Sequence, residues 1–131
     1  MNSETAAHGS AKVRTFRDLF VWQKGMDLVE ATYAISARLP RHEMFGLRMQ
    51  MERAAVSIPA NIAEGHARKL TGEYLHHLAF AAGSAAELQT HLEIVVRLKY
   101  LKPEEVRLAK QLCEEESRML HALMLRLKQK R

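Results

Sequence analysis

A line of polar side chains recurs every three or four residues between positions 50 and 64: Gln50, Arg53, Ser57, Asn61 and Glu64. At this spacing they share one face of an α-helix, beside an apolar face. Such a face could hold a polar ligand, and a serine with a nearby base could act as a nucleophile. Pro59 interrupts the same stretch at a cost of about 3 kcal/mol to a helix interior. Ser57 and Asn61 are well placed to compensate for the lost backbone hydrogen bond.

Two interpretations of this polar line are open. In the first, the line is a hydrogen-bonded network that fixes the register of two helices, with Arg53 paired to Glu64 or Glu87. Buried polar groups without partners cost roughly 1 to 3 kcal/mol each, and we therefore favour this interpretation. In the second, part of the line faces a subunit interface or a ligand site. The predicted structural polar network comprises Gln50, Arg53, Ser57, Asn61, Glu64, Ser84 and Glu87.

No catalytic residue is predicted, because neither Ser57 nor Ser84 lies in the glycine-flanked elbow that exposes a nucleophilic serine. Metal binding is not predicted either. Glu73 and His77 stand one helical turn apart, but a structural metal site needs four converging ligands, and no HExxH or CxxC spacing occurs. The lone Cys113 fits an apolar pattern and is expected to pack as a small hydrophobe. We accordingly expect no cofactor.

Basic residues outnumber acidic ones by 20 to 15, which gives a formal net charge of +5. This balance permits an acidic partner, including the phosphates of nucleic acid, without identifying it. No base-reading motif or exposed aromatic platform is visible, so base-specific readout is not indicated. For each basic residue, a merely solvated surface is the competing interpretation. The candidate nucleic-acid contacts are Arg41, Arg48, Arg68, Lys69, Lys99, Lys102, Arg107, Lys110, Arg126, Lys128, Lys130 and Arg131.

The elements that position these residues are predicted to be helices. The composition is rich in Ala, Leu, Met, Glu, Lys and Arg, which favour helix. Apolar residues spaced three and four apart predict helices over about 17–38, 44–64, 72–100 and 103–128. Short connections make an all-α, antiparallel up-and-down four-helix bundle the expected fold. The predicted parts are a mobile N-terminal tail (1–15), a single bundle domain (16–128) and a basic C-terminal end (129–131).

Each helix also has a predicted buried stripe. The stripe of the first helix is Leu19, Trp22, Met26, Val29 and Tyr33. The stripe of the second is Leu47, Met51, Ala54, Ile58 and Ile62, and that of the third is Tyr74, Leu78, Ala81, Ala85, Leu88, Leu92 and Val95. On the fourth helix, Glu114, Glu115 and Glu116 are predicted to face solvent.

Three residues are assigned to kinking and close packing. Pro59 is expected to kink the second helix, and Gly65 to end it, because a chain can turn at glycine with positive φ at little cost. The small residues around Gly83 are expected to let the third helix pack tightly against the Pro59 region. No apolar run approaches the roughly 18 residues of a membrane span, and no secretory signal is visible. A cytoplasmic protein without a membrane partner is therefore expected.

Four groups of residues between Phe16 and Leu101 carry a family resemblance: Phe16, Leu19, Val21, Trp22, Gln23 and Lys24; Leu39, Pro40, Glu43, Phe45, Gly46, Leu47 and Gln50; Arg53 to Gly65; and Ala82, Gly83, Ser84, Glu87 and Leu88. They resemble the 23S rRNA intervening-sequence protein family, often called four-helix bundle proteins. The resemblance implies an up-and-down bundle, assembly as a homopentamer and no catalytic activity. Related proteins are encoded within ribosomal RNA genes or partner a reverse transcriptase.

The predicted function is a non-enzymatic, oligomeric interaction module that binds RNA, DNA or a nucleic-acid enzyme through basic surface residues. Met51 and Glu52 depart from the family pattern, where aliphatic and basic residues are common, and make the second helix less basic. The alternative is a small-molecule or metal-binding bundle, or an enzyme with a site in the bundle core or an oligomer pore.

Overall fold

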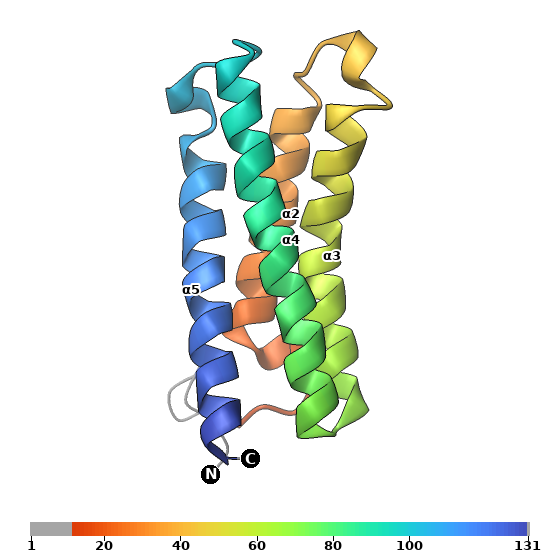
Figure 1. Cartoon of the computed structure of the whole chain (residues 1–131), viewed down its shortest axis with the longest axis vertical. Coiled ribbons are helices and arrows are strands. Elements are labelled where there is room, and N and C mark those ends of the chain that lie inside the picture. The colour runs from red at the N-terminus through yellow and green to blue at the C-terminus, as the bar shows by residue number, and fades with distance from the viewer. Residues whose placement is uncertain (1–11, 131) are drawn as a thin grey trace.

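The computed structural model describes residues 12–130, and within this range the chain forms helices and no strands. The α-helices are α2 (Phe20–Ser36), α3 (Leu47–Arg68), α4 (Thr71–Arg97) and α5 (Arg107–Lys130). Short 3-10 helices precede three of them: η1 (Phe16–Asp18), η2 (Arg41–Glu43) and η3 (Pro103–Glu105). Consecutive α-helices run in opposite directions (Figure 1). The predicted all-α four-helix bundle is confirmed.

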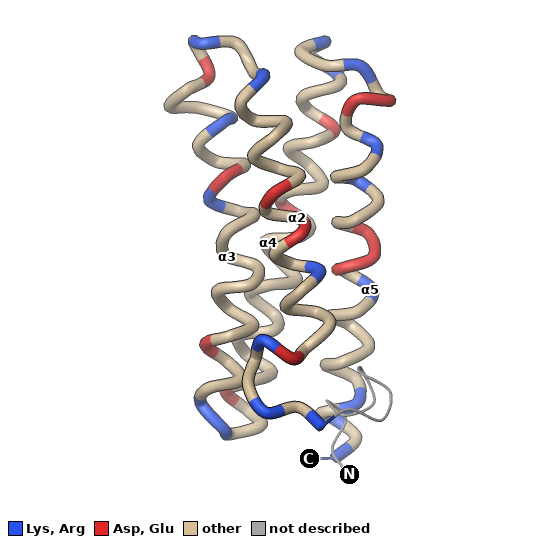
Figure 2. The backbone as a smooth tube through the Cα atoms, turned by 180° about the vertical axis from the view of Figure 1, so that it is seen from behind, with Lys and Arg blue, Asp and Glu red and all other residues tan. Residues whose placement is uncertain are grey.

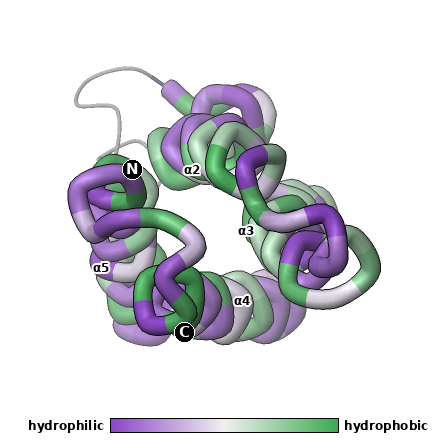
Figure 3. The backbone as a smooth tube through the Cα atoms, turned by 90° about the horizontal axis from the view of Figure 1, so that it is seen from above, coloured by the Kyte–Doolittle hydropathy of each residue, from purple (hydrophilic) through white to green (hydrophobic). Residues whose placement is uncertain are grey.

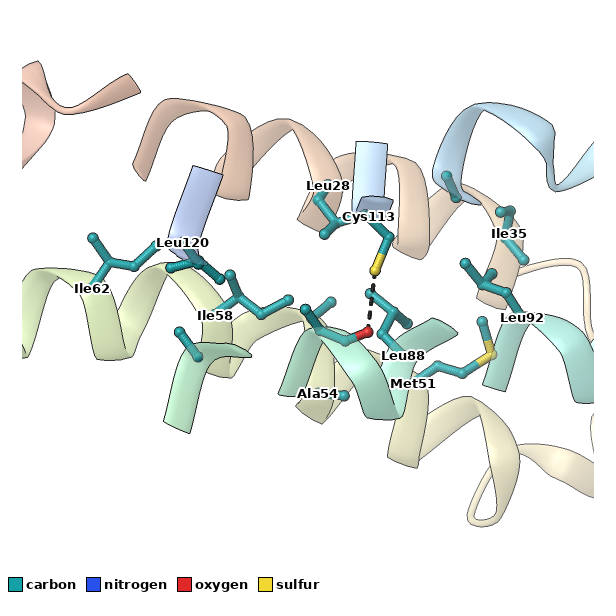
Figure 4. Packing of buried hydrophobic residues seen from close by; sticks show 14 of the residues in the cluster. Leu28, Ile35, Met51, Ala54, Ile58, Ile62, Leu88, Leu92, Cys113 and Leu120 are labelled. Atoms are coloured by element: carbon teal, nitrogen blue, oxygen red, sulfur yellow. Dashed lines mark hydrogen bonds between the residues drawn. The ribbon is translucent and has the colours of Figure 1, made fainter. Parts of the chain in front are cut away.

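The four helices surround one apolar core. α2 and α4 each pack against both α3 and α5, so α2 and α4 occupy opposite corners of the bundle (Figure 3). Side chains from all four helices meet between them (Figure 4). Each fully buried Leu or Ile in this core contributes about 1.5 to 3 kcal/mol relative to an exposed position. No helix between residues 12 and 130 combines the length and apolarity that a membrane crossing requires.

The buried stripes of α3 and α4 are the ones that the apolar spacing predicts. All five predicted positions of α3 and all seven of α4 are buried. These stripes consist almost wholly of apolar residues at helical spacing, so their periodicity is unobscured. The prediction for these two core faces is confirmed.

The predicted stripe of α2 is correct only in part: Leu19 is buried and Trp22 and Val29 pack against the core, but the other two positions are exposed. Met26 and Tyr33 are 40% and 43% exposed, and the buried face instead consists of Val21, Gly25, Leu28, Thr32, Ile35 and Ser36. Three members of the true stripe are glycine, threonine or serine, which an apolar pattern does not count. Trp22 is half-buried, and its ring meets that of Phe16 edge to face at a centroid distance of 5.3 Å.

Gly65 does not end the helix as predicted, because α3 continues to Arg68 and the left-handed residue is Lys69, at φ 63°. Gly65 is buried inside the helix for a different reason. A Cβ atom added there would lie 2.7 Å from Cβ of His77 and 3.2 Å from Cδ1 of Tyr74. The missing side chain therefore lets the first turns of α4 pack against the end of α3.

The described part of the predicted tail, residues 12–15, leads into η1. Thr15 caps η1 by accepting a hydrogen bond from the backbone of Arg17, and Val13 packs against the core. These two residues of the predicted tail thus contact the bundle, and residues 1–11 lie outside the described range. In the predicted basic end, Lys130 belongs to α5, and Arg131 lies outside the described residues.

Candidate functional site

The seam between α3 and α4 carries a short hydrogen-bonded network. The hydroxyl oxygens of Ser57 and Ser84 lie 2.5 Å apart, which confirms that the two helices touch here. Asn61 donates from Nδ2 to the carbonyl of Ser57 at 2.8 Å. Its Oδ1 is then left to accept a hydrogen bond from Nδ1 of His77, 3.1 Å away. This contact assigns the ring proton of His77 to Nδ1.

The remaining members of the predicted network do not join it. Arg53 is exposed, and its Nη2 lies 3.7 Å from Sδ of Met49. Glu64 instead contacts Arg68 at 3.4 Å and His77 at 3.6 Å. Among the described residues no ion pair links Arg53 to Glu64 or Glu87, so that predicted pairing is wrong. The predicted pairing fails because the rotation of α3 about its own axis turns the edge that carries Arg53 toward solvent.

Two further members of the predicted network, Gln50 and Glu87, are also exposed. Glu87 lies 3.4 Å from the ring of buried His91, one turn along α4. The network in the structure is therefore Ser57, Ser84 and Asn61, with His77 added. From the sequence, His77 stands out only as a possible metal ligand beside Glu73. Its spacing of three residues from Tyr74, a core position, is the signal that places it beside the helix seam.

Close packing at Pro59 and Gly83 differs from the prediction. A Cβ atom added at Gly83 would meet no atom within 4 Å, so Gly83 faces open space. Pro59 packs against α2, where a Cβ added at Gly25 would lie 3.5 Å from Cβ of Pro59. Ser57 donates to the carbonyl of Ala54 at 2.8 Å, within the turn that precedes Pro59. The ring of Pro59 thus faces Gly25 of α2, and the neighbouring Ser57 makes the contact with α4.

The most unusual buried group is Glu116, which was predicted to face solvent. Its side chain is fully buried, and neither carboxyl oxygen has a hydrogen-bond partner among the described residues. Burial raises the pKa of Glu116 to about 8, with Asp27 acting in the same direction and Lys24 opposing. The carboxyl therefore carries a proton at neutral pH. A Cβ at Gly25 would lie 2.9 Å from Oε2 of Glu116, so glycine makes room for it.

The sequence does contain a signal for Glu116. The buried positions Ala109, Cys113, Glu116, Leu120 and Leu123 follow the four-three spacing of a helix stripe. Because Glu114 and Glu115 stand directly before it, Glu116 looks in the sequence like part of a charged run that faces solvent. Glu114 is exposed, as predicted, whereas Glu115 is half-buried and its carboxylate accepts a hydrogen bond from Lys24 at 2.7 Å.

Two other titratable groups inside the bundle are also held neutral. Desolvation lowers the pKa of His91, and a nearby Glu87 opposes that effect. Burial raises the pKa of the Cys113 thiol to about 12, and its Sγ lies 3.2 Å from the carbonyl of Ala85. Cys113 is therefore a packed small side chain, as predicted. No group of three or more His, Cys, Asp or Glu among the described residues is arranged to hold a metal ion.

Charge is segregated along the bundle. One end is formed by residues 12–19, 64–73 and 121–130, which carry eight Lys or Arg against three Asp or Glu. We call this the basic end. The opposite end, residues 37–52 and 97–107, carries seven against four, whereas the middle of the bundle carries four against seven. Basic residues accordingly gather toward both ends in Figure 2, with acidic residues prominent between them.

Several predicted contact residues are engaged in ion pairs. Arg48 pairs with Glu52 at 3.1 Å, Arg68 with Glu64 at 3.4 Å and Lys110 with Glu93 at 2.5 Å. At the opposite end from the basic end, Arg38 pairs with Glu105, and a hydrogen bond of 2.7 Å joins Tyr100 to Glu43. The acidic groups there offset the local positive charge. The exposed candidates at that end are Arg41, Lys99, Lys102 and Arg107.

The basic end brings together three segments that are distant in sequence. Lys69 is exposed at the α3–α4 turn, Lys128 is exposed near the end of α5, and Arg126 lies half-buried beside the start of α2. A hollow of about 710 Å³ lies at the same turn, lined by Arg68, His76 and His77 together with Leu70, Gly72 and Glu73. Only folding places these cationic groups around one end.

Comparison with known proteins identifies a matching family and a similar solved structure. A family profile described as 23S rRNA-intervening sequence protein matches residues 17–122. A crystal structure of a protein with unknown function from the S23 ribosomal protein family of Bacteroides thetaiotaomicron is similar, with a TM-score of 0.74 and 22% sequence identity. The alignment covers 79% of this chain and 97% of that chain, and at this identity it supports the fold. A search of curated proteins returned no significant match.

Proposed function

Because the chain belongs to the 23S rRNA-intervening sequence protein family, we propose that it is a non-enzymatic module that assembles with copies of itself and binds nucleic acid through its basic end. The observation that carries this proposal is the charge of that end, eight basic residues against three acidic ones. Phosphate attraction requires only clustered positive charge and no base-reading motif. The bound nucleic acid is RNA or DNA, held through its backbone.

Self-assembly would strengthen such binding. Large apolar side chains are exposed on both α3 and α4, where Val56 is 44% exposed and Phe80 is 52% exposed. Phe45, in the connection before α3, is 80% exposed. Exposed large apolar groups, where they gather into a patch, are typical of a surface that contacts another protein. A ring of copies, pentameric by family resemblance, would present one basic end per copy and raise the effective affinity for an extended nucleic acid.

The proposal is tested by fluorescence anisotropy with a labelled structured RNA and a labelled duplex DNA, between about 50 and 200 mM salt. Binding should weaken steeply as salt increases. The double variant Lys69→Gln/Lys128→Gln should reduce affinity for duplex DNA and lower its logarithmic salt slope by roughly 1.8, about 0.9 for each lost phosphate contact.

A matched control removes the same charge elsewhere. Arg97→Gln/Arg118→Gln takes two exposed basic residues from outside the basic end and should change affinity much less. Light scattering on each variant checks that assembly is unchanged. If the intact oligomer binds neither nucleic acid at low salt, the nucleic-acid part of the proposal is wrong. A protein partner, such as a nucleic-acid enzyme with an acidic surface, then becomes the remaining candidate.

A further inference from the structure

A small apolar cleft lies between the beginning of α2 and the last turns of α5. Its volume is about 200 Å³, and its floor includes Leu19, Val21 and Leu123, which are all buried. Phe20 and Ala122 form part of the rim, and Arg126 also lines the cleft. An apolar concavity with one polar group at its edge is the usual form of a small-molecule site.

Arg126 supplies the second observation. Its Nε is buried and donates no hydrogen bond to any of the described residues. A buried donor on a charged group is costly when it has no acceptor, and such a group calls for an explanation. Arginine presents its N–H groups as a planar fork that matches the two oxygens of a carboxylate. The polar edge of the cleft is therefore suited to a carboxylate.

We propose that this cleft binds a medium-chain carboxylate, with the hydrocarbon tail against Leu19, Val21 and Leu123 and the carboxylate on Arg126. The size of the tail follows from the volume. A dry apolar cavity of about 150 Å³ accepts benzene, with six carbons, so a cleft of about 200 Å³ suits roughly six to eight. The surplus of positive charge at the basic end also favours an anionic head group over a neutral or cationic one.

The test is isothermal titration calorimetry of the full chain with sodium octanoate, which stays monomeric at millimolar concentration. One molecule of octanoate should bind per chain. From butanoate to octanoate, Kd should fall about two- to fourfold per added methylene, as expected for a partly to fully buried CH₂. Octylammonium, with the same tail and the opposite charge, should bind at least tenfold more weakly than octanoate.

Three variants, one of them a control, separate this site from adventitious binding. Arg126→Gln should weaken octanoate binding about tenfold or more, since a charge-assisted hydrogen bond is lost. Arg118→Gln, which removes an exposed arginine two turns earlier on α5, should change Kd less than twofold. Ala122→Phe places a large side chain at the rim and should abolish binding while thermal melting by circular dichroism confirms a folded bundle.

The cleft does not depend on the nucleic-acid proposal. Lys69→Gln/Lys128→Gln should retain octanoate binding, and Ala122→Phe should retain binding to RNA and DNA. The carboxylate proposal is overturned if octanoate fails to bind at millimolar concentration, or if it binds Arg126→Gln and Ala122→Phe as tightly as the wild type. An apparent Kd for octanoate that changes with protein concentration would also count against the proposal, because octanoate would then be binding at a surface where copies of the chain associate.

Discussion

Glu116→Gln should remove most of a distinctive pH dependence of stability. The folded chain holds the Glu116 proton with a pKa of about 8, against an ordinary value of 4.5. Below pH 4.5 both the folded and the unfolded chain carry this proton, and the group causes no pH dependence. Between these values only the unfolded chain ionises, so the wild type loses stability as pH rises. Above pH 8 both states are ionised, and the loss levels off.

The magnitude follows from the size of the pKa change. One pH unit corresponds to about 1.4 kcal/mol, and the interval from 4.5 to about 8 is roughly 3.5 units. The wild type should therefore lose about 5 kcal/mol over this interval relative to Glu116→Gln, because glutamine has the same shape and does not titrate. This change is comparable with the whole stability of many small domains, about 5 to 15 kcal/mol.

The measurement is urea unfolding of both proteins by circular dichroism at several pH values from 4.5 to 8.5. Glu115→Gln is the matched control. A hydrogen bond from Lys24 lowers the pKa of Glu115, so its contribution is present above the ordinary value and lost on acidification, the opposite direction. If Glu116→Gln and the wild type show parallel pH profiles, Glu116 is not a buried acid and the packing described around Gly25 is incorrect.

Other substitutions test the packing. Gly83→Ala should stabilise the bundle by about 1 kcal/mol in urea unfolding, because its Cβ meets open space in mid-helix. Gly65→Ala should destabilise it by about 1 to 3 kcal/mol, because its Cβ would clash with His77; equal effects of the two would contradict the glycine contacts. Asn61→Ala should cost about 2 kcal/mol through the lost contacts with Ser57 and His77, and an unchanged Tm and assembly would argue against a structural network. Cys113, with its pKa raised to about 12, should react with a thiol reagent at pH 8 only after unfolding; rapid reaction of the folded chain would show that the thiol is accessible.

The basic end shows that counting charges along the sequence underestimates how strongly they cluster on the folded surface. Counted along the sequence, the excess of positive charge is mild and lies mainly in the second helix and the C-terminal end. In the bundle, the α3–α4 turn, the end of α5 and the segment before α2 meet, and eight basic residues share one end. Antiparallel topology causes this gathering, because alternate chain connections and termini fall at the same end of a four-helix bundle.

The sequence predicts a polar network along α3, but it does not predict correctly which side chains belong to that network. Ser57, Asn61 and Ser84 are in contact, whereas Arg53 faces solvent. The spacing of three and four residues identifies a shared helix face but leaves the rotation of that face toward its neighbours undetermined. A side chain at the edge of the stripe therefore lies inside or outside according to how closely the next helix packs.

The sequence by itself determined four helices, their order and the apolar faces of α3 and α4, because helix propensity and apolar periodicity are local properties. Only the tertiary structure decided that Glu116 is buried, that the core face of α2 includes Gly25 and Thr32, and that Gly83 is open. Burial depends on the side chains that other helices bring to a position. Gly25 leaves room for Glu116 across the bundle, and those two residues are far apart in the chain.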